Sequence, residues 1–148
     1  MYNVELAEHA WLNITQEDIK DIGSPLSELV KKDKEHLLCI ERKESVAELA
    51  GNCGEKRFLR ELKAMASFPH AFLLLEFDWH DIEQYPVGSR VPESKWSKIR
   101  IKGKYIMRVL SSAMVEHGIK VIACGNKKRA EETAFRIMRT VNDHYVQR

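Results

Sequence analysis

Short apolar runs alternate with longer stretches in which apolar residues recur at helical spacing. The runs cover residues 37–43, 71–77 and 119–124 and are typical of strands buried on both faces. The amphipathic stretches predict helices over three further ranges: 55–67, 103–117 and 128–142. This order predicts an α/β fold with a mainly parallel central sheet flanked by helices, because parallel strands need helical crossovers.

Several local signals refine this pattern. A helix beginning near Ser45 is expected to be interrupted at 51–54, and Gly118 is expected to end the helix over 103–117. Residues 79–93 contain Pro86, Gly88 and Pro92, which predicts a long loop, and loops of that length are often functional.

The first 36 residues permit more than one interpretation. Residues 3–6 could form a short strand, and Thr15 could cap a short helix. Ser24 and Pro25 could open a helix that continues to Val30, or a turn that leads into a strand. The pattern alone does not decide between these alternatives.

Length and composition fit one globular domain over residues 1–148. The net charge of +2 does not identify a nucleic-acid binder, and no apolar run approaches the roughly 20 residues of a membrane span. Cys39, Cys53 and Cys124 show no CxxC spacing and predict reduced thiols rather than a zinc site. With no secretion signal at the N-terminus, these features favour a cytoplasmic protein.

Basic residues gather in one segment. No acidic residue occurs from Ser94 to Val115, whereas six basic residues do. We expect this segment to contact the phosphate backbone of DNA, although such a run can also be a solvated helix face. The basic residues are Lys95, Lys98, Arg100, Lys102, Lys104 and Arg108.

The first buried run ends in Glu41-Arg42-Lys43. Side chains alternate along a strand, so Glu41 and Lys43 are predicted on one face and Arg42 on the other. A carboxylate beside an ammonium at a strand end is the layout of a divalent-metal phosphodiesterase, in which the carboxylate binds Mg²⁺ or Mn²⁺. The alternative is a surface ion pair.

The Ile40–Lys43 stretch resembles the core motif of the XPF-type nuclease domain, which belongs to the PD-(D/E)XK superfamily. The resemblance continues through Glu48–Ala50, Arg57–Leu62 and Leu73–Glu76 and covers about residues 37–145. It is closest to compact bacterial and phage versions of the domain. It implies a restriction-endonuclease-like fold and a metal-dependent endodeoxyribonuclease that acts on branched or flapped DNA in a bacterial or phage-infected cell.

The resemblance also implies roles for individual residues. Glu41 matches a metal-binding carboxylate, Lys43 the catalytic lysine, and Arg42 the arginine that supports the site between them. Arg57 matches an arginine near the start of a helix. Glu76 matches the glutamate that closes the next strand, where ligands bind in open α/β sheets.

Two departures from the family pattern concern the remaining acids. The acid expected after Glu-Arg-Lys is Glu48, one residue further on, and no Gly-Asp precedes the triplet. Counting back by the family spacing reaches Glu28 as a catalytic and metal-binding residue, with Asp33 as its rival. The same count places Glu5 as a further metal ligand and Glu8 as a supporting acid.

Other functions of the same fold remain open. The chain could be a catalytically inactive domain that binds DNA or another protein, or a restriction-type nuclease that cuts plain duplex. We expect no helix-hairpin-helix module after residue 148. We therefore expect DNA-structure choice to come from this domain, a homodimer or a partner protein.

Overall fold

The computed structural model describes residues 2–3 and 37–146. Its centre is a four-stranded sheet in the order β1-β2-β3-β4. β2, β3 and β4 are parallel, and β1 pairs antiparallel with β2. The strands are β1 (Tyr2–Asn3), β2 (Leu38–Lys43), β3 (His70–Leu75) and β4 (Lys120–Ala123). The predicted α/β fold with a mainly parallel sheet is confirmed.

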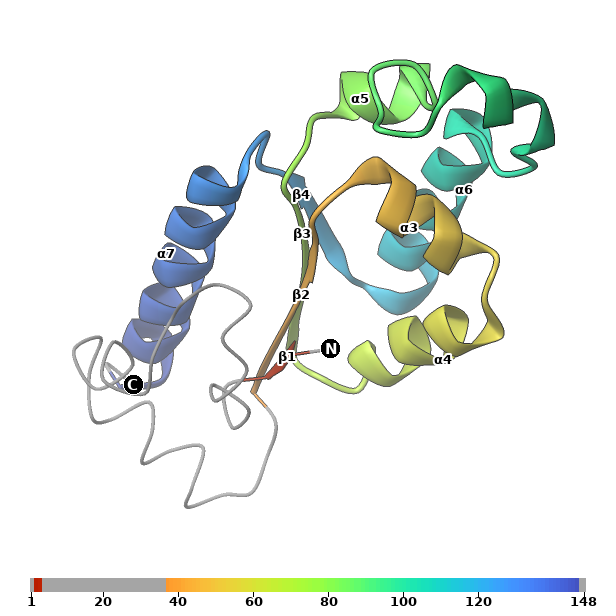
Figure 1. The fold of residues 1–148 in the computed structure, drawn as a ribbon. Helices are drawn as coiled ribbons and strands as arrows, with labels where there is room; N and C mark the ends of the chain where they lie inside the picture. The colour runs from red at the N-terminus through yellow and green to blue at the C-terminus, as the bar shows by residue number, and fades with distance from the viewer. Residues whose placement is uncertain (1, 4–36, 147–148) are drawn as a thin grey trace.

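Helices cover both faces of this sheet (Figure 1). Among the described residues, α7 (Lys127–Val146) lies by itself on one face. The other face packs against α3 (Val46–Cys53), α4 (Lys56–Met65) and α6 (Gly103–His117). The connection from β3 to α6 contains α5 (Trp79–Gln84) and a 3₁₀ helix (Glu93–Lys98).

The two faces of the sheet bury separate hydrophobic clusters. Cys39 on β2 packs in the cluster that includes α3, α4 and α6, whereas Leu38 and Ile40 pack in the cluster that includes α7. Alternate strand residues therefore meet different helices. The continuous apolar runs of the sequence follow from this double coverage.

The interruption predicted at 51–54 begins later than expected. α3 continues through Gly51 to Cys53, and Gly54 is its C-cap. The buried thiol of Cys53, which is 2% exposed, packs in the core, so tertiary packing extends the helix past the glycine.

The predicted loop over 79–93 is wrong in its first part, where α5 forms. Asp78 and Asp81 make a capping box, in which the Asp78 backbone N–H donates to the Asp81 carboxylate at 2.8 Å. Ile82 is fully buried against the core. A capped turn with one buried residue is enough to order this short helix.

The remaining predicted elements are found with small shifts at their ends. β3, which was predicted over 71–77, begins at His70 and ends at Leu75, so Glu76 and Phe77 follow it. Gly118 is the C-cap of α6, as predicted, and its φ of 65° lies in the left-handed region that glycine adopts readily. The proposed elements at Thr15 and at 24–30 lie outside the described residues. No helix of the described part is long and apolar enough to cross a membrane.

Candidate active site

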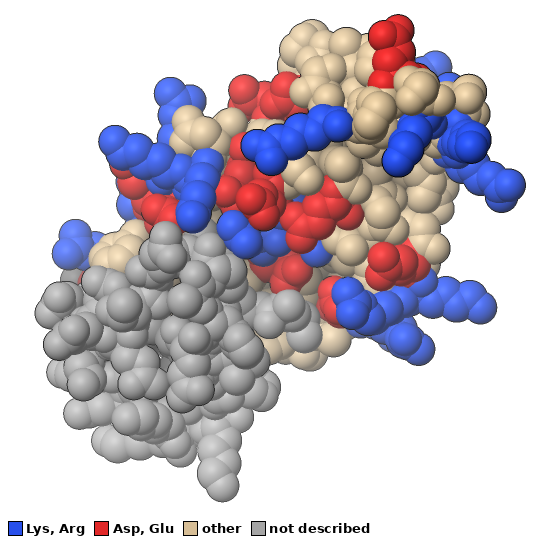
Figure 2. Space-filling view, viewed as in Figure 1, with Lys and Arg blue, Asp and Glu red and all other residues tan. Residues whose placement is uncertain are grey.

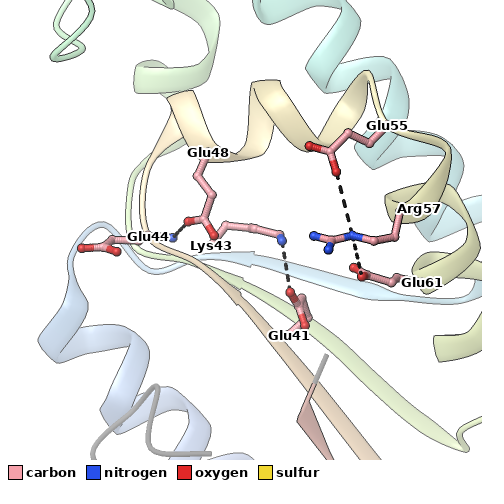
Figure 3. A network of polar contacts seen from close by, with 7 residues as sticks. All are labelled: Glu41, Lys43, Glu44, Glu48, Glu55, Arg57 and Glu61. Atoms are coloured by element: carbon pink, nitrogen blue, oxygen red, sulfur yellow. Dashed lines mark hydrogen bonds and ion pairs between the residues drawn. The ribbon is translucent and has the colours of Figure 1, made fainter.

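Glu41 and Lys43 lie on the same face of β2, as predicted, and form an ion pair. The Lys43 Nζ is 3.0 Å from the Glu41 Oε1. The Lys43 and Glu41 side chains are 6% and 12% exposed, so both groups are largely withdrawn from water. Figure 3 shows the pair beside α3 and α4. An ion pair with this little exposure is not the surface pair that was the alternative interpretation.

A ring and a thiol border the Lys43 ammonium. Its Nζ lies 5.0 Å from the centroid of the Phe58 ring, within cation–π range. Phe58 comes from the first turn of α4 and is 1% exposed. Burial raises the pKa of the nearby Cys53 thiol to about 11, although the Lys43 charge opposes this rise. Cys53 is therefore a neutral neighbour of the lysine.

Arg42 and Glu76 meet on the opposite face of the sheet. The Arg42 Nη1 lies 2.9 Å from the Glu76 Oε2, and the Glu76 side chain is 4% exposed. Burial raises the pKa of Glu76, and the Arg42 guanidinium opposes that rise. The structure therefore places Glu76 away from the face that carries Glu41 and Lys43, and its predicted supporting role would have to act through Arg42.

Glu48 caps α3. Its carboxylate accepts the backbone N–H of Glu44 at 2.8 Å, and its own N–H donates to the Ser45 Oγ at 3.1 Å. Both contacts satisfy backbone donors at the start of the helix. The sequence position that resembles a family acid thus has a structural role here.

Arg57 lies among carboxylates at the start of α4. Its Nε is 3.5 Å from the Glu61 Oε1 and 3.9 Å from the Glu55 Oε2, and its side chain is 70% exposed. Figure 3 shows this arginine together with the Glu41–Lys43 pair. An exposed guanidinium with weak partners is available to an incoming phosphate.

The residues present fit a divalent cation in part. Glu41 supplies a hard oxygen ligand that already holds a cation, the Lys43 ammonium. Mg²⁺ is commonly bound by only one or two carboxylates together with water and substrate phosphate. Within residues 2–3 and 37–146, no three His, Cys, Asp or Glu residues group to hold a metal. The predicted acids Glu5, Glu8, Glu28 and Asp33 lie outside the described residues.

The segment predicted to contact DNA exposes its basic side chains to solvent. All six of its basic residues are exposed, from Lys95 in the 3₁₀ helix to Arg108 in α6. Figure 2 shows Lys and Arg side chains projecting from the upper right, where Figure 1 places α6 and the 3₁₀ helix. Buried residues of α6, including Ile106 and Leu110, keep its other side against the core.

The contact of Phe58 with Lys43 was not predicted from the sequence. Its position in the apolar stripe of α4 predicts burial, but nothing in that stripe indicates that the ring would lie over the lysine of another element. The signal that could have suggested it is the helix following the Glu-Arg-Lys strand, because a crossover helix must pack back on that strand.

Comparisons with known proteins agree with this fold. A family model described as the ERCC4 domain matches residues 8–136. The XPF from Aeropyrum pernix superposes with a TM-score of 0.50 and 12% identity, covering 88% of this chain and 63% of that one. The same XPF in a complex with DNA gives a TM-score of 0.48, 12% identity, and coverages of 89% and 62%. This chain thus spans less than two thirds of that XPF, and curated proteins give no match.

Proposed function

Because this chain belongs to the ERCC4-domain family of XPF-type nuclease domains, we propose that it is a metal-dependent endonuclease that cuts branched or flapped DNA. The observation that carries this proposal is the largely buried ion pair of Glu41 and Lys43, 3.0 Å apart at the carboxyl end of β2. These are the first and last residues of the Glu-Arg-Lys triplet, and ligands bind at this edge of open α/β sheets.

In the proposed site, Glu41 would hold Mg²⁺ or Mn²⁺, with Glu28 or Asp33 and Glu5 as further candidate ligands. The bound metal would lower the pKa of a coordinated water and polarise the phosphate. Glu41 is suited to this role because its carboxylate is fixed by a 3.0 Å contact and its side chain is only 12% exposed.

Lys43 would act on the phosphate or on the attacking water. Its ammonium is confined between the Glu41 carboxylate and the Phe58 ring, which fixes where its charge lies. From there the ammonium can orient a water toward the phosphorus. It can also donate a hydrogen bond to a phosphate oxygen and so stabilise the negative charge that builds on that oxygen.

Arg42 would position Lys43 from the opposite face of the sheet. Its ion pair with Glu76 joins the ends of β2 and β3, and the Glu76 backbone N–H donates to the Lys43 carbonyl at 3.0 Å. Both contacts restrain the backbone from which Lys43 extends. A catalytic group displaced by even about 1 Å can lose most of its effect.

The DNA would lie along the exposed basic segment. Its six basic residues face no acid from within the same segment, so their charges can neutralise backbone phosphates without reading bases. We propose that preference for a DNA structure comes from this surface together with a homodimer or a partner protein.

A catalytically inactive DNA-binding domain is the second candidate. One observation favours it: the Glu41 carboxylate already has a cationic partner, the Lys43 ammonium at 3.0 Å. In that case Glu41 and Lys43 would serve only to stabilise the end of the sheet. A restriction-type nuclease is the third candidate and differs in its substrate.

The test is a cleavage assay of the whole chain on a flap, a fork and a plain duplex of matched sequence. Cleavage near the junction that requires Mg²⁺ or Mn²⁺ and is lost in Glu41→Gln is the expected result. Binding without cleavage under all metal conditions would support the inactive domain. Sequence-specific cleavage of the plain duplex would support the restriction-type nuclease.

A further inference from the structure

We infer that the start of α7 is a second DNA-binding surface, and that a branched substrate spans the carboxyl edge of the sheet with one arm on each surface. The first surface is the basic segment from Lys95 to Arg108. This inference rests on the proposed function, because it takes DNA as the ligand. It adds which part of a branched molecule each surface holds.

The start of α7 carries three consecutive basic residues. Lys127, Lys128 and Arg129 are all exposed. Figure 2 shows Lys and Arg side chains projecting at the upper left, where Figure 1 places this end of α7. Lys127 makes a long contact of 4.0 Å with Glu131, and an ion pair that is open to water is weak. Three adjacent exposed cations can neutralise phosphates of a DNA backbone.

Asn126 fixes the backbone that carries these three residues. Its Oδ1 accepts the Arg129 N–H at 2.9 Å, and its carbonyl accepts the Ala130 N–H at 3.1 Å. Both hydrogen bonds close the first turn of α7 without using a basic side chain. The basic side chains can therefore be replaced without removing the cap of the helix.

The turn that leads into α7 runs along the end of β3, beside the candidate active site. The Cys124 N–H donates to the Leu75 carbonyl at 2.8 Å. The next residue, Glu76, donates its backbone N–H to the Lys43 carbonyl at 3.0 Å. Burial raises the pKa of the Glu76 carboxyl, and Lys127 is among the charges near enough to oppose that rise. The start of α7 thus lies at the same edge of the sheet as Lys43.

The two basic surfaces belong to opposite sides of the sheet. α7 packs on one face, whereas α6, which follows the 3₁₀ helix of the basic segment, packs on the other (Figure 1). Figure 2 shows acidic side chains between the basic side chains of the two sides. A straight duplex that crossed from one surface to the other would lie over these acids, which repel its phosphates. The arms of a branched molecule diverge from their junction, so they reach both surfaces with only the junction above the acids.

The test is a salt titration of binding to a fork and to a linear duplex of equal length, by fluorescence anisotropy without added metal so that no DNA is cut. The variant is Lys128→Gln/Arg129→Gln, which keeps Lys127 and its charge near the sheet edge. We expect it to bind the fork about tenfold more weakly than the wild type, with the slope of log K against log salt flattened by about one to two units. Its binding to the linear duplex should be unchanged. The matched control is Arg136→Gln/Arg139→Gln, two exposed arginines further along α7, which should bind both DNAs as the wild type does.

The outcomes separate this inference from the proposed function. Unchanged binding of the fork by the double variant would overturn the inference alone. An equal loss on the fork and on the linear duplex would also overturn it, because one surface would then serve both DNAs. A wild-type chain that binds neither DNA would overturn the proposed function together with the inference. Circular dichroism checks folding, and the single variants Lys128→Gln and Arg129→Gln replace the double variant if it does not fold.

Discussion

Arg42 and Glu76 form a 2.9 Å ion pair on the face of the sheet opposite the one that carries Lys43 and Glu41. The same Glu76 donates its backbone N–H to the carbonyl of Lys43 at 3.0 Å. Glu76, which follows β3, thus contacts two consecutive residues of β2. Its side chain pairs with Arg42, and its backbone binds Lys43. The geometry of the proposed active site depends on this junction.

Arg42→Met should destabilise the protein more at pH 8 than at pH 5. Burial raises the pKa of Glu76 and Arg42 opposes the rise, so removing Arg42 raises this pKa further in the folded state. The folded state then binds a proton more strongly than the unfolded state, and stability increases as the pH falls. We expect a loss of about 2 kcal/mol at pH 8, below the ~3–5 kcal/mol for a fully buried pair because Arg42 is partly exposed.

Urea unfolding followed by circular dichroism at the two pH values measures this difference. The double variant Arg42→Met/Glu76→Leu should recover most of the lost free energy, since it removes both charges. An equal loss at both pH values would mean that Glu76 does not carry the effect.

Gly103→Ala should destabilise the fold by about 2 kcal/mol or more. A Cβ at this position would lie 2.2 Å from the Ile82 carbonyl oxygen, a backbone atom that cannot move without shifting α5. Gly51→Ala is the matched control, because a Cβ there meets nothing within 4 Å. The control lies inside α3 and should gain about 0.5–1 kcal/mol from its better helix propensity. Thermal unfolding of both variants tests whether the first loses stability and the second gains it.

Replacing Lys98, Arg100 and Lys102 together by Ala should weaken binding to every DNA structure alike. If the three side chains contact phosphates, the slope of log K against log salt should flatten by roughly two to three units. A salt titration by fluorescence anisotropy measures the slope. The control replaces Lys56, Arg60 and Lys63, three exposed basic residues of α4, and should leave the slope unchanged. An unaltered slope in the first variant would place the DNA elsewhere.

Glu28→Gln should reduce cleavage more at low than at saturating metal concentration, because a ligand has lost its charge. Asp33→Asn is the comparison. Metal titrations of the cleavage rate distinguish the two residues. A damaging Asp33 change beside a silent Glu28 change would transfer the ligand role to Asp33.

The fold was predictable from sequence where packing follows a simple period. The runs that became β2, β3 and β4 are apolar because helices cover both sides of the sheet, and a continuous run expresses that directly. α5 was missed because its order depends on a capping box and one buried side chain, Ile82, rather than on a periodic stripe. The extension of α3 past Gly51 was missed because tertiary packing overrides helix propensity.

The candidate site was predictable only where it follows from the alternation of side chains along one strand. Strand alternation placed Glu41 beside Lys43 and put Arg42 on the other face, and the structure agrees. Alternation within one strand does not say which face a residue of another element will share. The partners from other elements, Glu76 for Arg42 and Phe58 for Lys43, therefore emerged only with the register of β2 against β3 and the packing of α4.

The proposed function requires that Lys43 acts in cleavage and is not only a structural partner of Glu41. The most direct measurement is the single-turnover cleavage rate of Lys43→Ala on a flap substrate at saturating Mg²⁺, with DNA binding measured in parallel by fluorescence anisotropy. We expect a loss of at least about 100-fold in rate, the range for removing one catalytic group, with DNA affinity retained. Cleavage at a near wild-type rate by the folded variant would contradict it.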